Sequence, residues 1–251
     1  MPFMQSVEKA AGYFDIRKVI WTMRYVISDI HGCKKEYLQL LNKIQFSDQD
    51  HLYILGDILD RGFDPIGVLQ DVMKRKNVTF ILGNHEHLFW YFIKTLGFEL
   101  SNFQSEEEKL DFRLWIKDGG LPTLNGFIDL PATIKKQIFE FIGNTKAYEV
   151  LENEGKKYIL VHAGITEFKE EKPLDQYQCL DFIYERIDYN ERYYKDENTF
   201  IISGHTPTSF LRTDKKPEVF RQNGHIAIDC GCVYGGKLAA YCIETGDVVY
   251  V

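Results

Sequence analysis

Hydrophobic and polar positions alternate along the first third of the chain in an order that predicts strands and helices following one another. Short apolar runs at 24–29, 51–57 and 78–82 are typical of buried strands. The segments between them, 34–44 and 65–75, carry apolar residues at helical spacing. This βαβαβ order predicts a parallel sheet with right-handed crossovers.

The pattern changes between residues 100 and 145, where charged, helix-like stretches are interrupted by glycine and proline. Strand patterns return beyond it, at 146–152, 157–162, 199–204, 225–231, 237–244 and 247–251. A stretch near 175–194, rich in tyrosine and acidic residues, is predicted to be helical. We expect residues 23–251 to form a single domain with a helical insertion or cap at 100–145. Residues 1–22 would be an N-terminal extension.

Composition and charge narrow the class of protein. With 251 residues, 45% of them hydrophobic and 27% charged, the chain can bury a sizeable core. Its formal net charge of -7 provides no basic field for a nucleic acid, so we expect no such partner. No apolar run approaches the roughly 18 residues that span a bilayer, so we expect no membrane association. The sequence does not predict an oligomeric state.

The five cysteines are odd in number and show no CxxC spacing, which favours a reducing, cytoplasmic location over a disulfide framework. The one CxC, Cys230 and Cys232, could be a metal or redox pair, or cysteine used as a small apolar residue at a strand end.

Ligand-type side chains follow the predicted strands. The first three strands are followed by Asp29 and His31, by Asp57, and by Asn84 and His85. Because the carboxyl ends of parallel strands meet at one edge of a sheet, where α/β proteins bind ligands, these side chains should lie close together. Two later strands end at His162 and His205, and glycine stands beside each of the five groups.

These residues indicate a metal site. A single histidine near a strand end is usually structural, but five strand ends that all carry ligand types make coincidence a poor explanation. Six side chains exceed the four that a tetrahedral zinc site requires, and Asp57 is central enough to bridge two ions. Oxygen and imidazole ligands without thiolate suit manganese, iron or zinc. We expect two divalent or trivalent ions, with manganese preferred.

The polar segments "SDIHG", "GDILDRG", "GNHE", "VHAG", "GHTP" and "IDCGCVYGGKL" resemble the signature blocks of the calcineurin-like metallophosphoesterases. Specifically, they resemble the phosphoprotein phosphatase family in its compact bacterial and phage form. The resemblance runs from about Arg24 to the C-terminus, except for 100–145. It implies an α/β metallophosphoesterase fold, with two mixed β-sheets in a sandwich flanked by helices.

The resemblance also implies roles for individual residues. Asp29 and His31 would bind the first metal, Asp57 would bridge, and Asn84, His162 and His205 would bind the second. A hydroxide between the ions would attack the phosphorus. His85 would be the general acid for the leaving alkoxide, with Asp60 holding its imidazole in the right tautomer.

Two arginines are expected to bind the phosphate, together with Asn84. A phosphate monoester dianion repels an anionic nucleophile, so the site must supply positive charge, and the planar fork of Arg61 suits phosphate oxygens. The family's second arginine lies in a W-x-R stretch. "FIYERIDY" makes Arg186 the candidate, although Tyr184 replaces the tryptophan.

We predict a serine/threonine protein phosphatase that acts on a phosphorylated protein or on a small phosphoester. The alternative is a diadenosine tetraphosphate hydrolase. The symmetrical bacterial form of those hydrolases usually lacks the second aspartate of the "GDxxDRG" block, so Asp60 favours monoester hydrolysis. A nucleic-acid phosphodiesterase would need a basic groove. A non-catalytic phosphate-binding module would not need the complete set of catalytic residues.

Overall fold

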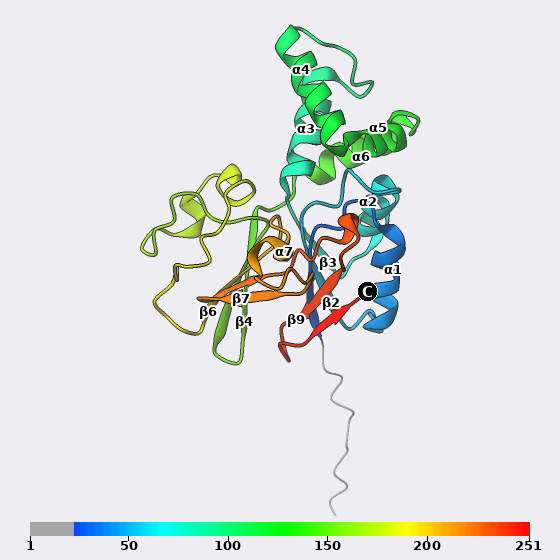
Figure 1. Ribbon diagram of the computed structural model, residues 1–251. Helices are drawn as coiled ribbons and strands as arrows, with labels where there is room; N and C mark the ends of the chain where they lie inside the picture. The colour runs from blue at the N-terminus through cyan, green and yellow to red at the C-terminus, as the bar shows by residue number, and fades with distance from the viewer. Residues whose placement is uncertain (1–22) are drawn as a thin grey trace, which may run out of the picture.

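Two five-stranded β-sheets form the centre of the molecule in the computed structural model, which describes residues 23–251 (Figure 1). The expected N-terminal extension, 1–22, lies outside the described residues. In the first sheet the order is β10 (Val248–Tyr250), β9 (Ala239–Cys242), β1 (Arg24–Ile27), β2 (His51–Leu55) and β3 (Val78–Ile81). In the second it is β4 (Tyr148–Asn153), β5 (Lys156–Val161), β6 (Thr199–Ser203), β8 (His225–Ala227) and β7 (Phe220–Gln222).

Both sheets are mixed, and each has a parallel centre. β1, β2 and β3 pair in parallel, as the βαβαβ pattern predicts, and β5, β6 and β8 do the same in the second sheet. The outer strands β10, β9, β4 and β7 pair antiparallel to their neighbours. The α/β fold with two mixed sheets is therefore confirmed. β7 is a strand that the sequence pattern did not predict.

Residues that alternate along a strand face two different cores. In β1, Val26 packs in an apolar cluster shared by both sheets, whereas the next residue, Ile27, packs toward the helices. In β2, Leu55 joins the shared cluster and Ile54 the other. Because successive side chains point to opposite faces of a strand, this near-continuous apolar run is typical of a strand that is covered on both sides.

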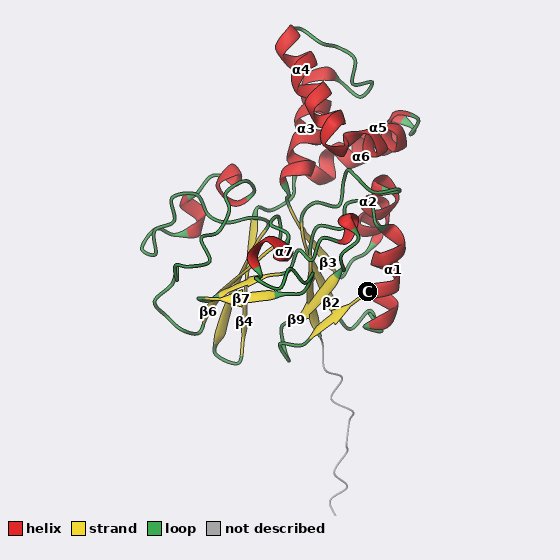
Figure 2. Ribbon diagram, viewed as in Figure 1, coloured by secondary structure: helices red, strands yellow, loops and turns green. Residues whose placement is uncertain are grey.

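Helices cover the outer face of the first sheet (Figure 2). They are α1 (Lys34–Lys43) and α2 (Pro65–Lys74), whereas α3 (Asn84–Leu96) extends away from the sheets. α2 begins with Pro65 in its first turn, and its N-cap Asp64 accepts a hydrogen bond from the Gly67 amide at 2.8 Å. α3 begins directly after β3, so the first turn of this helix lies at the carboxyl end of the sheet. Among residues 23–251, no helix is long and apolar enough to cross a membrane.

Residues 106–143 fold into helices that stack with α3 to one side of the sheets (Figure 1). We call this segment the helical region. It contains α4 (Glu106–Trp115), a π-helical turn (Ile116–Gly120), α5 (Leu121–Ile128) and α6 (Ala132–Gly143). Trp115 is 2% exposed and packs on Phe89, Phe92 and Phe112. These aromatic contacts fix the end of α4 against α3.

The helix predicted near 175–194 is wrong. That stretch contains only short 3₁₀ turns, at Leu174–Gln176 and Cys179–Phe182, followed by irregular backbone. Its carbonyl groups bond to the segment after β5 instead: the Ala163 amide donates to Phe182 O at 2.9 Å and the Thr166 amide to Asp181 O at 2.9 Å. Backbone groups used in this tertiary pairing cannot also close helical turns.

Candidate metal centre and active site

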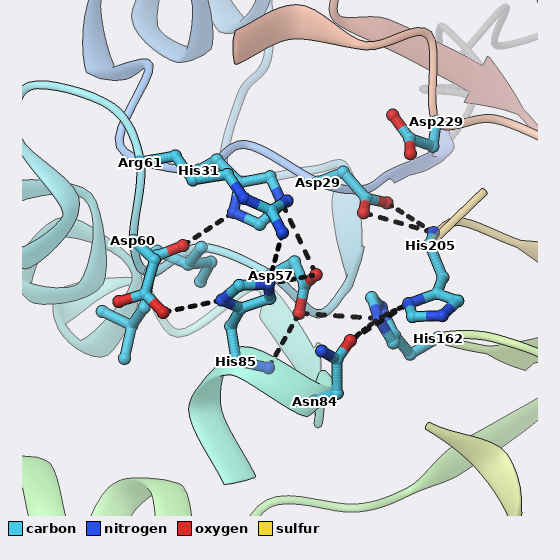
Figure 3. A network of polar contacts seen from close by, with 12 residues as sticks. Asp29, His31, Asp57, Asp60, Arg61, Asn84, His85, His162, His205 and Asp229 are labelled. Atoms are coloured by element: carbon cyan, nitrogen blue, oxygen red, sulfur yellow. Dashed lines mark hydrogen bonds and ion pairs between the residues drawn. The ribbon is translucent and has the colours of Figure 1, made fainter. Parts of the chain in front are cut away.

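The strand ends of both sheets bring the predicted ligands to one place (Figure 3). Asp29 and His31 follow β1, Asp57 follows β2, and Asn84 and His85 begin α3. His162 and His205 come from the second sheet, after β5 and β6. Most of these side chains are buried: Asp29, His31, Asp57, His85 and His162 are at most 4% exposed.

The backbone around these residues is strained. Six of the twelve non-glycine residues with positive φ in the described chain are candidate site residues: Asp29, His31, Asp57, Asp60, Arg61 and His205. Positive φ is costly for residues with a Cβ and persists where the surrounding structure enforces it. The concentration of such residues at the strand ends points to a site built for function.

Asp57 lies between two groups of histidines. Its Oδ2 is 3.5 Å from His31 Nε2, and its Oδ1 is 3.5 Å from His162 Nε2. Burial alone would raise the pKa of Asp57, but the surrounding histidines, His85 among them, hold it well below its ordinary value. With one oxygen turned toward each group, the carboxylate has the arrangement that bridging two ions requires.

Two histidines direct their Nε2 atoms toward Asp57. His31 Nδ1 lies 2.8 Å from Leu59 O, and His162 Nδ1 lies 2.7 Å from Leu55 O. Since a carbonyl only accepts, Nδ1 carries the proton and Nε2 keeps its lone pair in the neutral ring. Burial lowers the pKa of His31 to about 3 and also lowers that of His162, which favours this neutral form.

A second group of possible metal ligands lies around Asn84. Its Oδ1 is 2.9 Å from His162 Nε2 and 3.0 Å from His205 Nδ1. The His205 backbone amide donates to the Asp29 carboxylate at 3.0 Å, which joins this group to the end of β1. Within the described chain, Asp57, His162 and His205 form one candidate metal group, and His31, Asp57 and His85 form another.

The donor set fits divalent metal ions. Asp229, which the sequence pattern did not single out, is 4% exposed and lies beside Asp29 (Figure 3). Burial and neighbouring acids raise the pKa of Asp229 to about 7 and that of Asp29 well above its ordinary value. Buried carboxylates that repel one another, mixed with neutral imidazoles, are a chemical environment that cations stabilise.

His85 forms a close pair with Asp60. His85 Nδ1 lies 2.6 Å from Asp60 Oδ2, and Asp60 is fully buried. Burial disfavours the imidazolium, but the carboxylates of Asp57 and Asp60 outweigh burial and raise the pKa of His85 to about 9. Arg61 Nη2 lies 2.9 Å from His85 Nε2, a contact that only the neutral ring accepts. The two carboxylates thus favour the imidazolium, whereas the positive charge of Arg61 opposes it.

The candidate ligands open into a cleft of about 550 Å³. Arg61 and Arg186 both line it, so the two expected phosphate-binding residues lie on the same cavity as Asn84 and His85. Arg186 Nη1 also donates to Thr206 Oγ1 at 2.8 Å, immediately after His205. The arrangement can hold metal ions on one side and a phosphate group between two guanidinium groups.

The family model for calcineurin-like phosphoesterases matches residues 24–250, and therefore nearly all of this chain. The chain belongs to the calcineurin-like phosphoesterase family. It is accordingly a hydrolase, and its family implies divalent metal ions at a site of this kind.

Several sequence relatives of this phosphoesterase are named bis(5'-nucleosyl)-tetraphosphatases. The asymmetrical bis(5'-nucleosyl)-tetraphosphatase PrpE of Oceanobacillus iheyensis is 28% identical over 90% of each chain. A symmetrical bis(5'-nucleosyl)-tetraphosphatase of Proteus mirabilis is 30% identical, but over only 57% of this chain and 44% of the relative.

Solved structures support the fold. A structure provisionally described as a diadenosine tetraphosphatase aligns with a TM-score of 0.61 at 18% identity, over 93% of this chain and 94% of the other. A protein serine/threonine phosphatase from Saccharomyces cerevisiae reaches a TM-score of 0.51 at 15% identity, over 92% and 79%. The protein phosphatases are thus distant structural neighbours of this phosphoesterase.

The sequence pattern gave no sign of what the helical region contacts in this phosphoesterase. Trp115 Nε1 donates to Asp60 Oδ2 at 2.8 Å, and Thr123 Oγ1 donates to Asp60 Oδ1 at 2.6 Å. Asp118 lies 3.3 Å from Arg61 Nη2, and the Arg61 amide donates to Gly119 O at 2.8 Å. The segment expected only as a cap therefore positions both Asp60 and Arg61. No local motif marks these residues, because their partners lie more than 50 positions away.

Two residues beside His85 have different surroundings. Glu86 is fully buried and accepts hydrogen bonds from the amides of Asp57, Ile58 and Leu59 at 2.8–2.9 Å. It therefore holds the loop after β2 in place. His87 lies two residues after His85 in the first turn of α3, with Nδ1 3.2 Å from the Tyr184 hydroxyl, and is not among the candidate ligands.

Among the described residues, the two cysteines of the CxC sequence share no candidate metal group. Cys230 is buried. Cys232 lies near Cys33 and Glu36, and the two sulfur atoms and the carboxylate oxygen of these three residues are all within 4.8 Å of one another. All five cysteines in residues 23–251 are free thiols.

Proposed function

We propose that this phosphoesterase hydrolyses dinucleoside tetraphosphates to unequal products, a nucleoside triphosphate and a nucleoside monophosphate. The observation that carries the proposal is the match to the asymmetrical tetraphosphatase of Oceanobacillus iheyensis, which extends over 90% of both chains. The cleft is compatible with it, because two arginines and a cluster of metal-type donors suit the negative charge of a polyphosphate.

The residues that would hold the metal ions are those gathered at the strand ends. Asp29, His31 and Asp57 would hold one ion, and Asp57, Asn84, His162 and His205 the other, with Asp229 adding negative charge nearby. Divalent ions bound there would activate water and neutralise phosphate charge. Manganese remains our expectation, with iron or zinc as alternatives.

The protein's own side chains would bind and orient the substrate. The guanidinium groups of Arg61 and Arg186 would each contact phosphate oxygens and hold the phosphorus in line for attack. His85, with its Nδ1 proton directed to Asp60, would hold a second proton at Nε2, facing the leaving oxygen. Asn84 would lie beside the transferred phosphate.

The serine/threonine phosphatase interpretation is retained as a second candidate because of the His85–Asp60 pair. An alkoxide leaving group is a strong base and needs an acid, whereas a departing nucleotide is already a stable anion. The presence of Asp60 weighs only against the symmetrical tetraphosphatases, so it is compatible with the asymmetrical reaction. The relatives therefore support the dinucleotide substrate better than the phosphoprotein.

The test is turnover of metal-depleted protein refilled with manganese, on diadenosine tetraphosphate and on a phosphothreonine peptide in parallel. Nucleotides are separated by ion-exchange chromatography, and free phosphate is quantified. We expect ATP and AMP in equal amounts and a much lower rate on the peptide. ADP as the sole product would contradict the asymmetrical assignment, and preference for the peptide would overturn the proposal in favour of the protein phosphatase.

A further inference from the structure

Two large aromatic side chains stand exposed at the cleft that holds the arginines. Phe210 is 72% exposed and Tyr234 is 65% exposed, and both line the same cavity as Arg61 and Arg186. Single exposed apolar residues are common on protein surfaces. What distinguishes these two is their place at the mouth of a site for a phosphorylated ligand.

Tyr234 is held beside a phosphate-binding arginine. It ends a 3₁₀ turn, Cys232–Tyr234, between Gly231 and Gly235, which both have left-handed φ values, of 69° and 80°. Its ring centre lies 5.6 Å from the guanidinium carbon of Arg61. The ring is therefore next to the group that would bind a phosphate, with much of its surface still free.

Phe210 is held on the segment that follows His205. It lies in α7 (Thr208–Leu211), whose first amide donates to Asp229 O at 2.8 Å. The Phe210 amide donates to Pro207 O at 2.9 Å, which fixes the turn that presents the ring. Backbone hydrogen bonds thus tie this aromatic side chain to the loops that carry His205 and Asp229.

We propose that Phe210 and Tyr234 form a nucleobase subsite, in which the rings stack on the bases of a dinucleoside polyphosphate whose phosphates lie between Arg61 and Arg186. The inference rests on the proposed function. A ligand with a charged polyphosphate centre and flat apolar ends matches a cleft with guanidinium groups inside and aromatic faces at its mouth. Stacking on an aromatic side chain tolerates any base, because every base has a π-face.

The subsite is tested by measuring the turnover of the Phe210→Ala and Tyr234→Ala variants. Each variant is assayed on diadenosine tetraphosphate and on glycerol 2-phosphate, which has no ring. We expect kcat/KM on the dinucleotide to fall roughly 5-fold to 100-fold more than on glycerol 2-phosphate in each variant. Phe210→Leu keeps apolar bulk without a π-face and should resemble Phe210→Ala. Tyr91→Ala removes a 41% exposed tyrosine of α3 outside the cleft and serves as the matched control.

Binding separates this inference from the proposed function. Calorimetric titration of the manganese-loaded protein with ATP and with tripolyphosphate, at fixed free manganese, measures what the base adds. We expect tighter binding of ATP in the wild type and loss of that preference in both alanine variants. Equal affinities in the wild type, or a preference that survives both substitutions, would overturn the subsite. A wild type that prefers ATP but leaves diadenosine tetraphosphate intact would retain the subsite and reject the proposed function.

Discussion

The strand ends and the helical region both contribute to the candidate site, but they do so in different ways. At the strand ends, side chains of the two sheets point at one another, and neutral imidazoles surround Asp57. The helical region places Asp118 on the cleft but contributes no member of the two candidate metal groups around Asp57. It holds Asp60 through hydrogen bonds from Trp115 and Thr123, and Arg61 through the carbonyl group of Gly119. The comparison separates residues that would perform chemistry from residues that fix their geometry.

The largest effect should come from breaking the centre of the strand-end cluster. Asp57→Asn removes the charge that faces both groups of histidines, so both ions should bind weakly. We expect kcat/KM to fall about 1000-fold or more, which corresponds to several kcal/mol of lost electrostatic stabilisation. Elemental analysis should find less metal per chain, and Asp48→Asn, an exposed acid, is the control. Retention of one tightly bound ion would argue against a bridging role.

His85 lies between the two regions, because it contacts both Asp57 and Asp60. Its substitution should affect a phosphothreonine peptide and diadenosine tetraphosphate to different extents. His85→Asn should lower turnover of a phosphothreonine peptide by about 100-fold to 10,000-fold, because an alkoxide needs the acid. The loss on diadenosine tetraphosphate should be much smaller, since the departing nucleotide is stable without a proton. Steady-state rates on both substrates measure the ratio, with His87→Gln as the neighbouring histidine control. Equal losses would remove His85 from the role of acid.

A smaller effect should follow from loosening the contact between the helical region and Asp60. Trp115→Phe removes the indole N–H that donates to Asp60 and keeps most of the aromatic packing. We expect a loss of roughly 10-fold in kcat, as for other groups that orient an active-site residue, and about 1–3 kcal/mol of unfolding free energy.

Trp90→Phe is a matched control for Trp115→Phe, because the buried Nε1 of Trp90 has no hydrogen-bond partner among the described residues. Urea denaturation and turnover are measured for both variants. If Trp90→Phe lowered kcat as much as Trp115→Phe, the hydrogen bond to Asp60 would not be the cause.

The smallest effect is expected where the helical region contacts Arg61. A Cβ added at Gly119 would lie 2.5 Å from Arg61 Cγ, so Gly119→Ala should displace that side chain and raise KM several-fold. Gly97 also has a positive φ, but a Cβ added there would meet no atom within 4 Å. Both variants should lose roughly 1–3 kcal/mol of stability from the strained backbone. Only Gly119→Ala should change KM, and a change in both would point to general strain instead.

The sequence by itself determined the strand ends. The candidate ligands stand at or shortly after the end of an apolar run, with a glycine within three positions. The strand period and the rule that parallel strands share an edge together predict that these residues meet. β1, α1, β2, α2 and β3 follow from the same periodicity with small differences at their ends. This information is local, so a single sequence contains it.

Only the tertiary structure decided the rest. Trp115 and Thr123 contact Asp60 across 55 and 63 positions of sequence, and Asp229 becomes an acidic neighbour of Asp29 only when the second sheet packs on the first. The absent helix at 175–194 has the same cause, since its carbonyl groups are used by the segment after β5. Local patterns report backbone preference and burial, whereas the partner of a buried polar group depends on packing between segments that are remote in sequence.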